Sequence, residues 1–469
     1  MDRGKGRVAT LPPWAFLLGL GVLLEGGLVA LLLLMYRFPE LFDNVYGYFP
    51  GTRYFFARGW GIAPPASISS GAFSRAFGAL WFALNGAWLG AFRLARRTRW
   101  KGRTLLAVVL GCGLVFEVTL VLGMPPLLST DLYNYLAYGR MWADRGLNPY
   151  LLPPSQIGSD PVLAFPLWDI VTHYGPVWTA LEAAVARLSA SDGIFGALLL
   201  FKGCAAVGHL AIAWIGYLLA AQQDRNAAAG TLLLLGWSPL LLLEGAGNGH
   251  NDLAMMALAM AGLLSFRVRR PWAGYLLLLL SALVKYVTLL LLGFCLLAWL
   301  RLEESTGKRL RLLAALVGVG LILLAAAYAP FWQGPATVLA GLGEETTHLM
   351  LSPSAFLHLT LQRLWAHGTR IRPEAVVQGL QKGGLLLLLL WQGVRLWRRP
   401  GPSWEEATAA WNVTCFLYLI LLHNAIFPWY FIWPYTTAAT QTTRPAGRRV
   451  ALLSGGLGSL AVLLYALPL

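Results

Sequence analysis

The chain has 469 residues, of which 57% are hydrophobic and 12% charged, and its formal net charge is +15. An average globular domain carries about twice that share of charged residues, so the composition excludes an ordinary soluble enzyme. It indicates an all-α integral membrane protein that crosses the bilayer many times.

Apolar runs recur along the whole chain, and each crossing of a bilayer needs about 20 helical residues. A basic N-terminus precedes the run from Trp14 to Met35, which we interpret as a first span because it is long and no small-residue cleavage site follows. Residues 272–300 are open to interpretation as two spans or as one span containing Lys285. In chain order, the predicted spans of this single domain (1–469), about thirteen in number, are 14–36, 73–92, 104–124, 194–220, 226–244, 251–266, 272–285, 286–300, 312–330, 383–396, 405–424, 427–443 and 450–468.

The distribution of lysine and arginine predicts the orientation of these spans. With the spans above, one side of the membrane holds 23 of the 36 basic residues and only 6 of the 21 acidic ones. Cytoplasmic loops carry such an excess, so this side and the N-terminus are predicted to be cytoplasmic. Topology therefore explains the basic charge, and no nucleic-acid partner is needed.

Three long segments, 37–72, 125–193 and 331–382, are predicted on the outer, non-cytoplasmic face. The second of them contains Val177–Leu188, an amphipathic stretch that we expect to lie as a helix in the interface. Aromatic residues crowd these segments, and anchoring at the membrane surface explains many of them without any function.

The outer segment 125–193 contains the most polar stretch of the chain, "STDLYNYLAYGRMWADRGLNPY", from Ser129 to Tyr150. Ser129 or Thr130 is suited to cap a helix that runs to about Arg145 and stops at Gly146. An acid in the first turn complements the helix dipole, and this structural role alone would explain an acid at position 131. The predicted helix places Asp131, Asn134, Tyr135 and Tyr138 on one face, and pairs Arg140 with Asp144 on another.

Four further polar clusters fall on the same predicted face. They read "GAGNGHND" (245–252), "ALVKYVT" around Lys285, "LLHNAIFPWYFIWPY" around His423, and "HYGPVW" (173–178). A snorkelling lysine and an aromatic belt would account for parts of them. Polar groups at membrane depth are costly, however, and topology alone puts all five clusters on one side. We expect them to line one outward-facing cavity.

We interpret the polar residues within the spans as structural. Glu25, Glu117, Lys202 and His209 lie within spans, and pairing of Glu117 with Lys202 would lower the cost of burying them. A proton or ion path through these residues is the alternative. The four cysteines lie in apolar runs, which predicts neither disulfides nor a sulfur-ligated metal.

The motifs "STDLYNYLAYGRMWADRGLNPY", "YGPVW", "GNGHNDLAMM", "ALVKY" and "FPWYFIWP", in this order, resemble those of the polyprenol-phosphate-mannose-dependent mannosyltransferases, multispanning glycosyltransferases of the GT-C class. The resemblance covers about residues 120 to 435. It implies a GT-C-like fold, a polyprenyl-phosphate-linked sugar as donor, and an acid in the first large outer loop as catalytic base. Asp131 occupies that position.

The resemblance suggests an inverting reaction in which Asp131 deprotonates an acceptor hydroxyl of a glycan or glycolipid. Tyr133 stands where a metal-binding DxD pattern would have its second acid, which argues against a tightly bound metal. A divalent cation (Mg²⁺ or Mn²⁺) is left open as an assistant. The predicted substrate-binding residues are Arg140, His250, Lys285 and His423 for the phosphate, Asn248, Asn251, Asp252 and Tyr174 for the sugar, Trp429 for stacking, and Tyr135, Tyr138 and Asn148.

Other functions remain open at this point. Another lipid-linked sugar, such as arabinofuranose or glucose, would suit the same residues, as would transfer of whole glycans. A transporter would need inverted repeats and broken helices at the bilayer midplane, neither of which the sequence clearly shows. A scaffold gives no reason for acids, histidines and a lysine to gather on one face.

Overall fold

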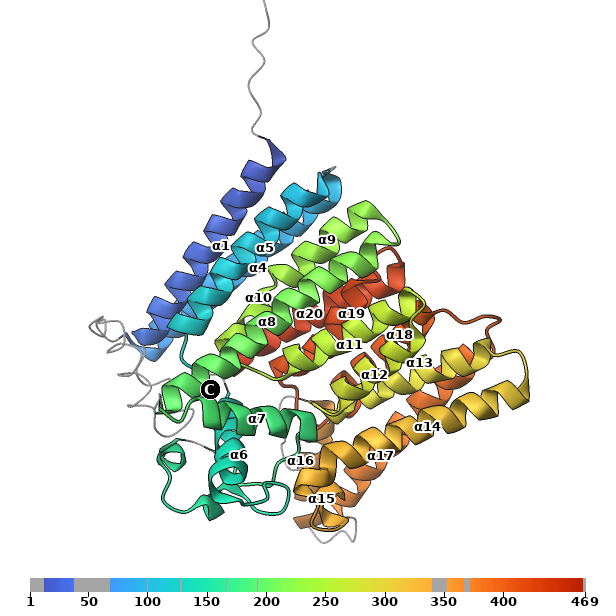
Figure 1. Cartoon of the computed structure of the whole chain (residues 1–469). Coiled ribbons are helices and arrows are strands. Elements are labelled where there is room, and N and C mark those ends of the chain that lie inside the picture. The colour runs from blue at the N-terminus through green and yellow to red at the C-terminus, as the bar shows by residue number, and fades with distance from the viewer. Residues whose placement is uncertain are drawn as a thin grey trace, which may run out of the picture.

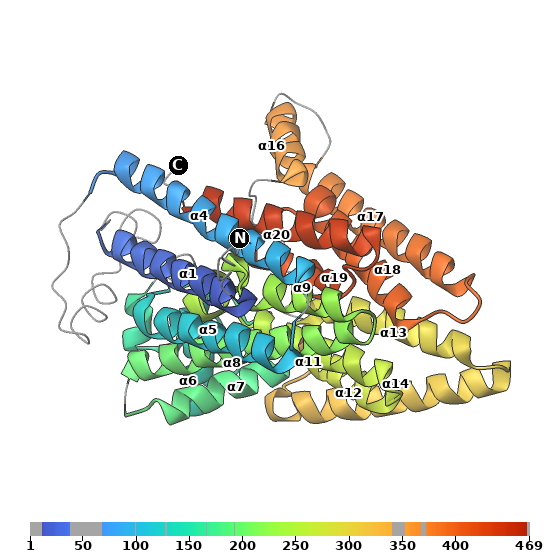
Figure 2. The ribbon, with the colours of Figure 1, turned by 90° about the horizontal axis from the view of Figure 1, so that it is seen from above.

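The computed structural model describes residues 12–37, 68–98, 100–126, 129–165, 167–191, 193–339, 352–366 and 372–466. The elements in these ranges are helices, without a strand. The predicted outer segment 37–72 lies almost entirely outside the described residues, as does the basic N-terminus. Helices α1, α4 and α5 lie on one side of a bundle and α13, α14 and α17 on the other (Figures 1 and 2).

Each predicted span coincides with a helix or with a helix that is broken once. Five helical segments are long and apolar enough to cross a membrane, and a sixth results if two helices bent by 41° are counted as one span, within the ranges described above. These helices fit a membrane protein, while the total of about thirteen spans stays a prediction. In chain order the helices are α1 (Pro13–Tyr36), α4 (Ser70–Arg97), α5 (Gly102–Gly123), α8 (Gly193–Ala221), the bent α9 (Arg225–Gly236) and α10 (Pro239–Leu242), α11 (Asp252–Arg267), α12 (Pro271–Ala282), α13 (Leu289–Leu302), α14 (Thr306–Tyr328), α17 (Pro373–Trp397), α18 (Trp404–Leu417), α19 (Ile432–Ala439) and α20 (Pro445–Ala466).

The stretch 272–300 forms two short antiparallel helices, α12 and α13, with Lys285 between them. Trp299 near the end of α13 contacts Trp272 at the start of α12, with ring centroids 5.4 Å apart. The chain therefore reverses at Lys285, and the alternative of one long span is wrong.

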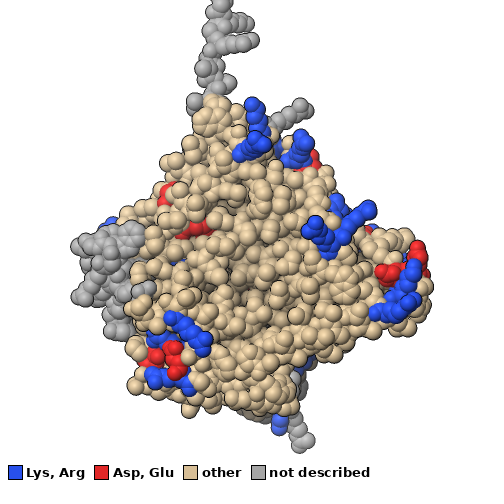
Figure 3. All heavy atoms as spheres, in the orientation of Figure 1, with Lys and Arg blue, Asp and Glu red and all other residues tan. Residues whose placement is uncertain are grey.

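The outer segment 125–193 contains two helices that lie together at one end of the bundle, α6 (Asp131–Arg145) and α7 (Pro176–Leu188) (Figure 1). Their bounds confirm the helices predicted there. On the face of the molecule seen in Figure 3, charged side chains gather at the edges and leave a broad, mostly uncharged belt between them. Such a belt is what contact with lipid requires.

The polar groups inside the bundle pair differently from the prediction. Glu117 on α5 forms its ion pair with His209 on α8. Lys202 donates to the backbone carbonyls of Leu120, at 2.7 Å, and Met124 at the end of α5. The expected Glu117–Lys202 salt bridge is thus replaced by a Glu117–His209 pair, because the register of α8 against α5 sets His209 opposite Glu117. All four cysteines are free thiols.

Candidate active site

Helix α6 begins at Asp131, and its N-cap residue Thr130 makes no side-chain capping hydrogen bond. The Ser129 hydroxyl accepts the Asp131 backbone N–H at 3.2 Å. Gly146 ends the helix in the left-handed conformation, with φ of 63°, which glycine adopts without strain. Asp131 therefore lies in the first turn, where the partial positive charge of the helix favours an anion.

The predicted polar face of α6 divides into two parts. Asn134 exchanges two hydrogen bonds with the backbone of Trp168, at 2.8 and 3.0 Å, and the Tyr138 hydroxyl donates to the carbonyl of Ile170 at 3.0 Å. These two side chains hold the loop before α7 in place. Asp131 and Tyr135 are left to face the bundle.

A distorted connection between α10 and α11 delivers the second set of polar groups. Residues Leu243–Gly247 form a π-helical turn, and Gly249 has φ of 73°. π-Helical turns are rare and concentrate at functional sites. Because of this turn, Glu244 and His250 come close together, and the His250 Nε2 atom lies 3.3 Å from Glu244 Oε2.

His250 lies between two carboxylates. Its Nδ1 atom is 3.3 Å from Asp131 Oδ2, on the side opposite to Glu244. The hydroxyl of Tyr174 donates to the same Asp131 oxygen at 3.1 Å, and Tyr135 approaches it at 3.5 Å. The indole of Trp429 stacks on the His250 ring with centroids 4.2 Å apart. Asp131 is thus surrounded by donors from three separate segments.

Lys285 forms the third part of the cluster. Its Nζ atom lies 3.1 and 3.3 Å from the two oxygens of Asp252, the first residue of α11. It also lies over the rings of Tyr430 and Trp433, at 5.4 and 5.3 Å from their centroids, a distance at which cation–π attraction operates. The Trp433 N–H donates to the Asp252 carboxylate.

A close backbone contact holds the segment that carries Tyr174 beside the segment that carries Lys285. Gly175 N donates to the Val284 carbonyl and Val177 N to the Leu283 carbonyl, both at 3.0 Å. A Cβ atom on Gly175 would lie 2.1 Å from the Leu283 oxygen, so only glycine permits this approach.

We therefore expect Gly175→Ala to push the two segments apart. The predicted result is a loss, by about tenfold or more, of the transfer activity that the sequence resemblance implies, because small misplacements of reacting groups are costly. Gly203→Ala in α8, where the added carbon meets nothing within 4 Å, is the matched control. Equal activities of the two variants and the wild type would contradict this role for Gly175.

The charges of the cluster shift the pKa values of its members. Burial would raise the pKa of Asp131, but His250, Lys285 and His173 outweigh it and hold that pKa well below its usual range. Burial would lower the pKa of His250, yet Asp131 and Glu244 raise it to about 9. Burial, followed by the Asp131 charge, raises the pKa of both Tyr135 and Tyr174. Near neutral pH the cluster thus contains an aspartate, an imidazolium and two neutral tyrosines.

Among the three acids, Asp131 is the one that can be reached from outside. Its side chain is 13% exposed, whereas those of Glu244 and Asp252 are fully buried. Asn251 is also buried, and neither polar atom of its side-chain amide has a hydrogen-bond partner in the described part of the chain. The Asn251 backbone N–H donates to the Tyr135 hydroxyl at 3.4 Å, so Asn251 belongs to the same cluster.

Several predicted site residues make other contacts. Arg140 forms a 2.6 Å ion pair with Asp160 instead of pairing with Asp144, so that part of the prediction is wrong. Arg140 is nine positions after Asp131 in the helix, and this offset of about two and a half turns places the two side chains on opposite faces of α6. The Asn148 amide donates to the Phe331 carbonyl at 2.7 Å, and His423 Nδ1 lies 2.8 Å from the Ala425 carbonyl. Asn248 donates to Glu244 at 3.0 Å and so lies beside the cluster.

Three neighbours of the cluster were not assigned a role from the sequence. Glu244 is in contact with His250, Trp433 binds Asp252, and His173 acts electrostatically on Asp131. Each stands within or next to a polar motif, which was the available signal. Their contacts depend on the π-helical turn and on packing between distant helices, which sequence spacing does not give.

Known proteins are similar to this chain in sequence. Residues 62–301 match the family described as alpha-(1->6)-mannopyranosyltransferase, N-terminal domain. The chain is 28% identical to alpha-(1->6)-mannopyranosyltransferase A of Mycobacterium tuberculosis over 386 residues, which is 79% of this chain and 71% of that protein. It is 24% identical to alpha-(1->6)-mannopyranosyltransferase B of Corynebacterium glutamicum over 351 residues, which is 68% of this chain and 56% of that protein.

The matched region includes these polar residues of the cluster described above: Asp131, Tyr135, Tyr174, Glu244, His250, Asn251, Asp252 and Lys285. Half of the chain matches the family, and the match ends within α13. The chain belongs to the alpha-(1->6)-mannopyranosyltransferase family, and it is a glycosyltransferase of the GT-C class.

Proposed function

We propose that this enzyme transfers mannose from a polyprenyl-phosphate donor to a hydroxyl of a glycan or glycolipid acceptor, on the non-cytoplasmic face of the membrane. The observation that carries the proposal is the position of Asp131, a partly exposed and ionised carboxylate surrounded by cations at one end of an apolar bundle. The names of the relatives support mannose, and the uncharged belt supports a donor that arrives through lipid.

In the proposed reaction the acceptor hydroxyl hydrogen-bonds to Asp131 and attacks the anomeric carbon of the mannose. The new C–O bond forms as the bond between that carbon and the phosphate oxygen breaks, with inversion, and the hydroxyl proton passes to Asp131. Polyprenyl phosphate leaves with the electron pair. A base of low pKa accepts this proton only as the hydroxyl becomes acidic, late in bond formation.

The charge that develops on the leaving phosphate needs partners. Lys285 and protonated His250 are the cations of the cluster, and α6 and α11 both begin there, so the positive ends of two helix dipoles add to them. Asn251 is the proposed partner of a sugar hydroxyl, since its buried amide has both a donor and an acceptor to offer. Trp429 is placed against His250, where its ring can stack on the sugar or the lipid chain.

The proposal leads to a specific pH dependence. Between about pH 6 and 8 the rate should be constant, since Asp131 is ionised and His250 protonated throughout. It should fall as the pH rises through about 9, where His250 loses its proton. The His250→Gln variant should be slower and should lack this alkaline fall. An initial-rate profile that instead rises through the ordinary histidine pKa would contradict it, provided that thermal unfolding shows a folded enzyme at each pH.

We expect transfer to proceed without a divalent cation. Asp131 and Glu244 share the cation His250, and Asp252 has Lys285, so the acids of the cluster already have cationic partners where a metal ion would have to bind. Within the described ranges no group of three or more His, Cys, Asp or Glu side chains has the arrangement of a metal site. Chelation with EDTA should leave the rate within about twofold; a loss that Mg²⁺ or Mn²⁺ restores would contradict this.

The function is tested with the purified chain in lipid vesicles, an acceptor glycolipid and radiolabelled donors. Label should move from polyprenyl-phosphate-mannose, and not from the soluble nucleotide sugar GDP-mannose. Faster transfer from polyprenyl-phosphate-arabinofuranose or polyprenyl-phosphate-glucose would reassign the sugar. No transfer from any lipid-linked sugar, with label instead moving across the vesicle membrane, would favour a transporter.

A further inference from the structure

The end of the bundle away from Asp131 contains a pocket that the reaction does not use. It has a volume of about 160 Å³, with room for several water molecules. Helix α11 runs from Asp252 in the active site to Arg267, which pairs with Glu405 next to this pocket. Sixteen helical residues span about 24 Å, so the pocket lies a full helix length from the site.

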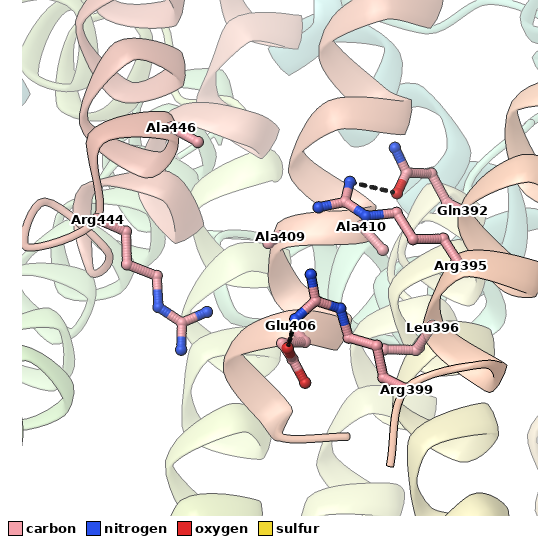
Figure 4. A pocket seen from close by; sticks show the side chains of 9 residues that line it. All are labelled: Gln392, Arg395, Leu396, Arg399, Glu406, Ala409, Ala410, Arg444 and Ala446. Carbon is pink, nitrogen blue, oxygen red and sulfur yellow. Dashed lines mark hydrogen bonds and ion pairs between the residues drawn. The ribbon is translucent and has the colours of Figure 1, made fainter. Parts of the chain in front are cut away.

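Four of the nine residues that line the pocket carry side-chain hydrogen-bond donors. Gln392 and Arg395 line it from the last turns of α17, Arg399 from the residues just after that helix, and Arg444 from the residue just before α20 (Figure 4). Glu406 is the one acid among the lining residues. Three arginines therefore face a single carboxylate.

Both oxygens of that carboxylate already accept a hydrogen bond. Glu406 Oε1 accepts from Arg399 at 2.6 Å, and Oε2 accepts the Ser403 backbone N–H at 3.0 Å in the capping box of α18. Among the described residues, Arg395 and Arg444 have no acidic partner. The pocket therefore retains two guanidinium groups whose charge is not neutralised.

A buried donor in the wall of the pocket also lacks an acceptor. Gln392 is 1% exposed, and its Nε2 atom has no hydrogen-bond partner in the part of the chain that is described. Its Oε1 atom faces Arg395 Nη1 at 3.4 Å. Leaving a buried N–H group unsatisfied is costly, so the wall is suited to a ligand that brings acceptor oxygens.

Three exposed apolar side chains lie beside the pocket. Trp391, Val394 and Trp397 follow the last turns of α17 and are 53%, 46% and 39% exposed. Large apolar side chains at this level of a membrane bundle contact lipid chains, and the two tryptophans suit the interface. The occupant must therefore combine an anionic, oxygen-rich group with hydrocarbon chains.

We propose that this pocket binds the phosphate headgroup of an anionic phospholipid in the leaflet opposite to the active site, with Arg395, Arg444 and Gln392 as its ligands. Guanidinium groups bind phosphate oxygens through paired hydrogen bonds, and basic pockets between membrane helices recognise such headgroups. The proposal concerns a site distinct from that of the donor and does not depend on the proposed transfer reaction.

The test uses the full chain reconstituted in phosphatidylcholine vesicles that contain about 10% phosphatidylglycerol, so that selective binding of the minor, anionic lipid can be detected. After detergent extraction, mass spectrometry measures the ratio of the two lipids that remain bound. The wild type should retain phosphatidylglycerol with at least about tenfold enrichment. The Arg395→Gln/Arg444→Gln variant should lose most of it. Gln392→Leu, which keeps every charge, should lose part of it.

The control is Arg448→Gln/Arg449→Gln, which removes two charges of the same α20 segment outside the pocket lining. Equal losses in this control would mean general surface attraction and would overturn the proposal. So would the absence of enrichment in the wild type. Inorganic phosphate is the second probe: if it raises the melting temperature of the solubilised chain through Arg395 and Arg444 while the lipid is not retained, the ligand is a soluble phosphate. Thermal unfolding of each variant excludes misfolding as the cause.

Discussion

Asp131→Asn should reduce mannosyl transfer by about 10²- to 10⁴-fold, the range that a positioned acid or base contributes. The amide has nearly the same shape and can still accept hydrogen bonds from Tyr174 and His250, but it cannot take up the proton of the acceptor hydroxyl. The donor should still bind. The measurement is the initial rate with labelled donor, together with donor affinity, in reconstituted vesicles.

The control for this variant lies on the same helix. Asp144 is an exposed acid of α6, away from the cluster. Asp144→Asn therefore removes one negative charge from the same helix, as Asp131→Asn does, without altering the site. It should keep at least about half of the wild-type rate, as surface substitutions usually do. If both variants retained activity, Asp131 would not be the base. If both lost it, the loss would have to be assigned to the fold of α6.

Lys285 gives the second large effect. Lys285→Gln should slow transfer by about 100-fold or more, because the leaving phosphate loses one of the two cations proposed to stabilise it. This substitution alone is ambiguous, since it also leaves the Asp252 carboxylate buried without its ion-pair partner. A structural defect would then resemble a catalytic one.

The double variant Lys285→Gln/Asp252→Asn separates the two causes. It removes both charges of the buried pair, and the new amide still accepts the Trp433 N–H. If Lys285 acts on the phosphate, the double variant should regain thermal stability and remain inactive. Recovery of activity together with stability would instead mean that Lys285 only neutralises Asp252. Melting temperature and transfer rate, measured on the same samples, decide between these outcomes.

Much of the site could be predicted from the sequence because its residues sit at the ends of helices. The helix from Asp131 to Arg145 follows from local turn signals, and the structure confirms its bounds. Where helices of a bundle begin and end at one membrane face, the polar residues at those ends must lie near one another. This is why the order of spans and loops along the chain was enough to place Asp131, His250 and Lys285 together, although they are far apart in sequence.

The partners of individual side chains could not be predicted in the same way. Arg140 has Asp144 four residues away, yet it binds Asp160, since a loop that folds back offers a more enclosed carboxylate. Glu117 binds His209 for a similar reason, the register of α5 against α8. Asn134 and Tyr138 share a helical face with Asp131 but hold a loop, which no spacing rule foretells. Side-chain pairing depends on tertiary packing, which cannot be predicted from the residue spacing of a single sequence.

The central claim is that the cluster around Asp131 holds the lipid-linked sugar. A photoreactive analogue of polyprenyl-phosphate-mannose, cross-linked to the full chain in vesicles, tests this without relying on activity. The modified peptides should come from residues 129–178, 244–252 and 283–288, and unlabelled donor should compete. Saturable labelling of residues 392–406 or 444–446 at the opposite end, with none around Asp131, would contradict the claim.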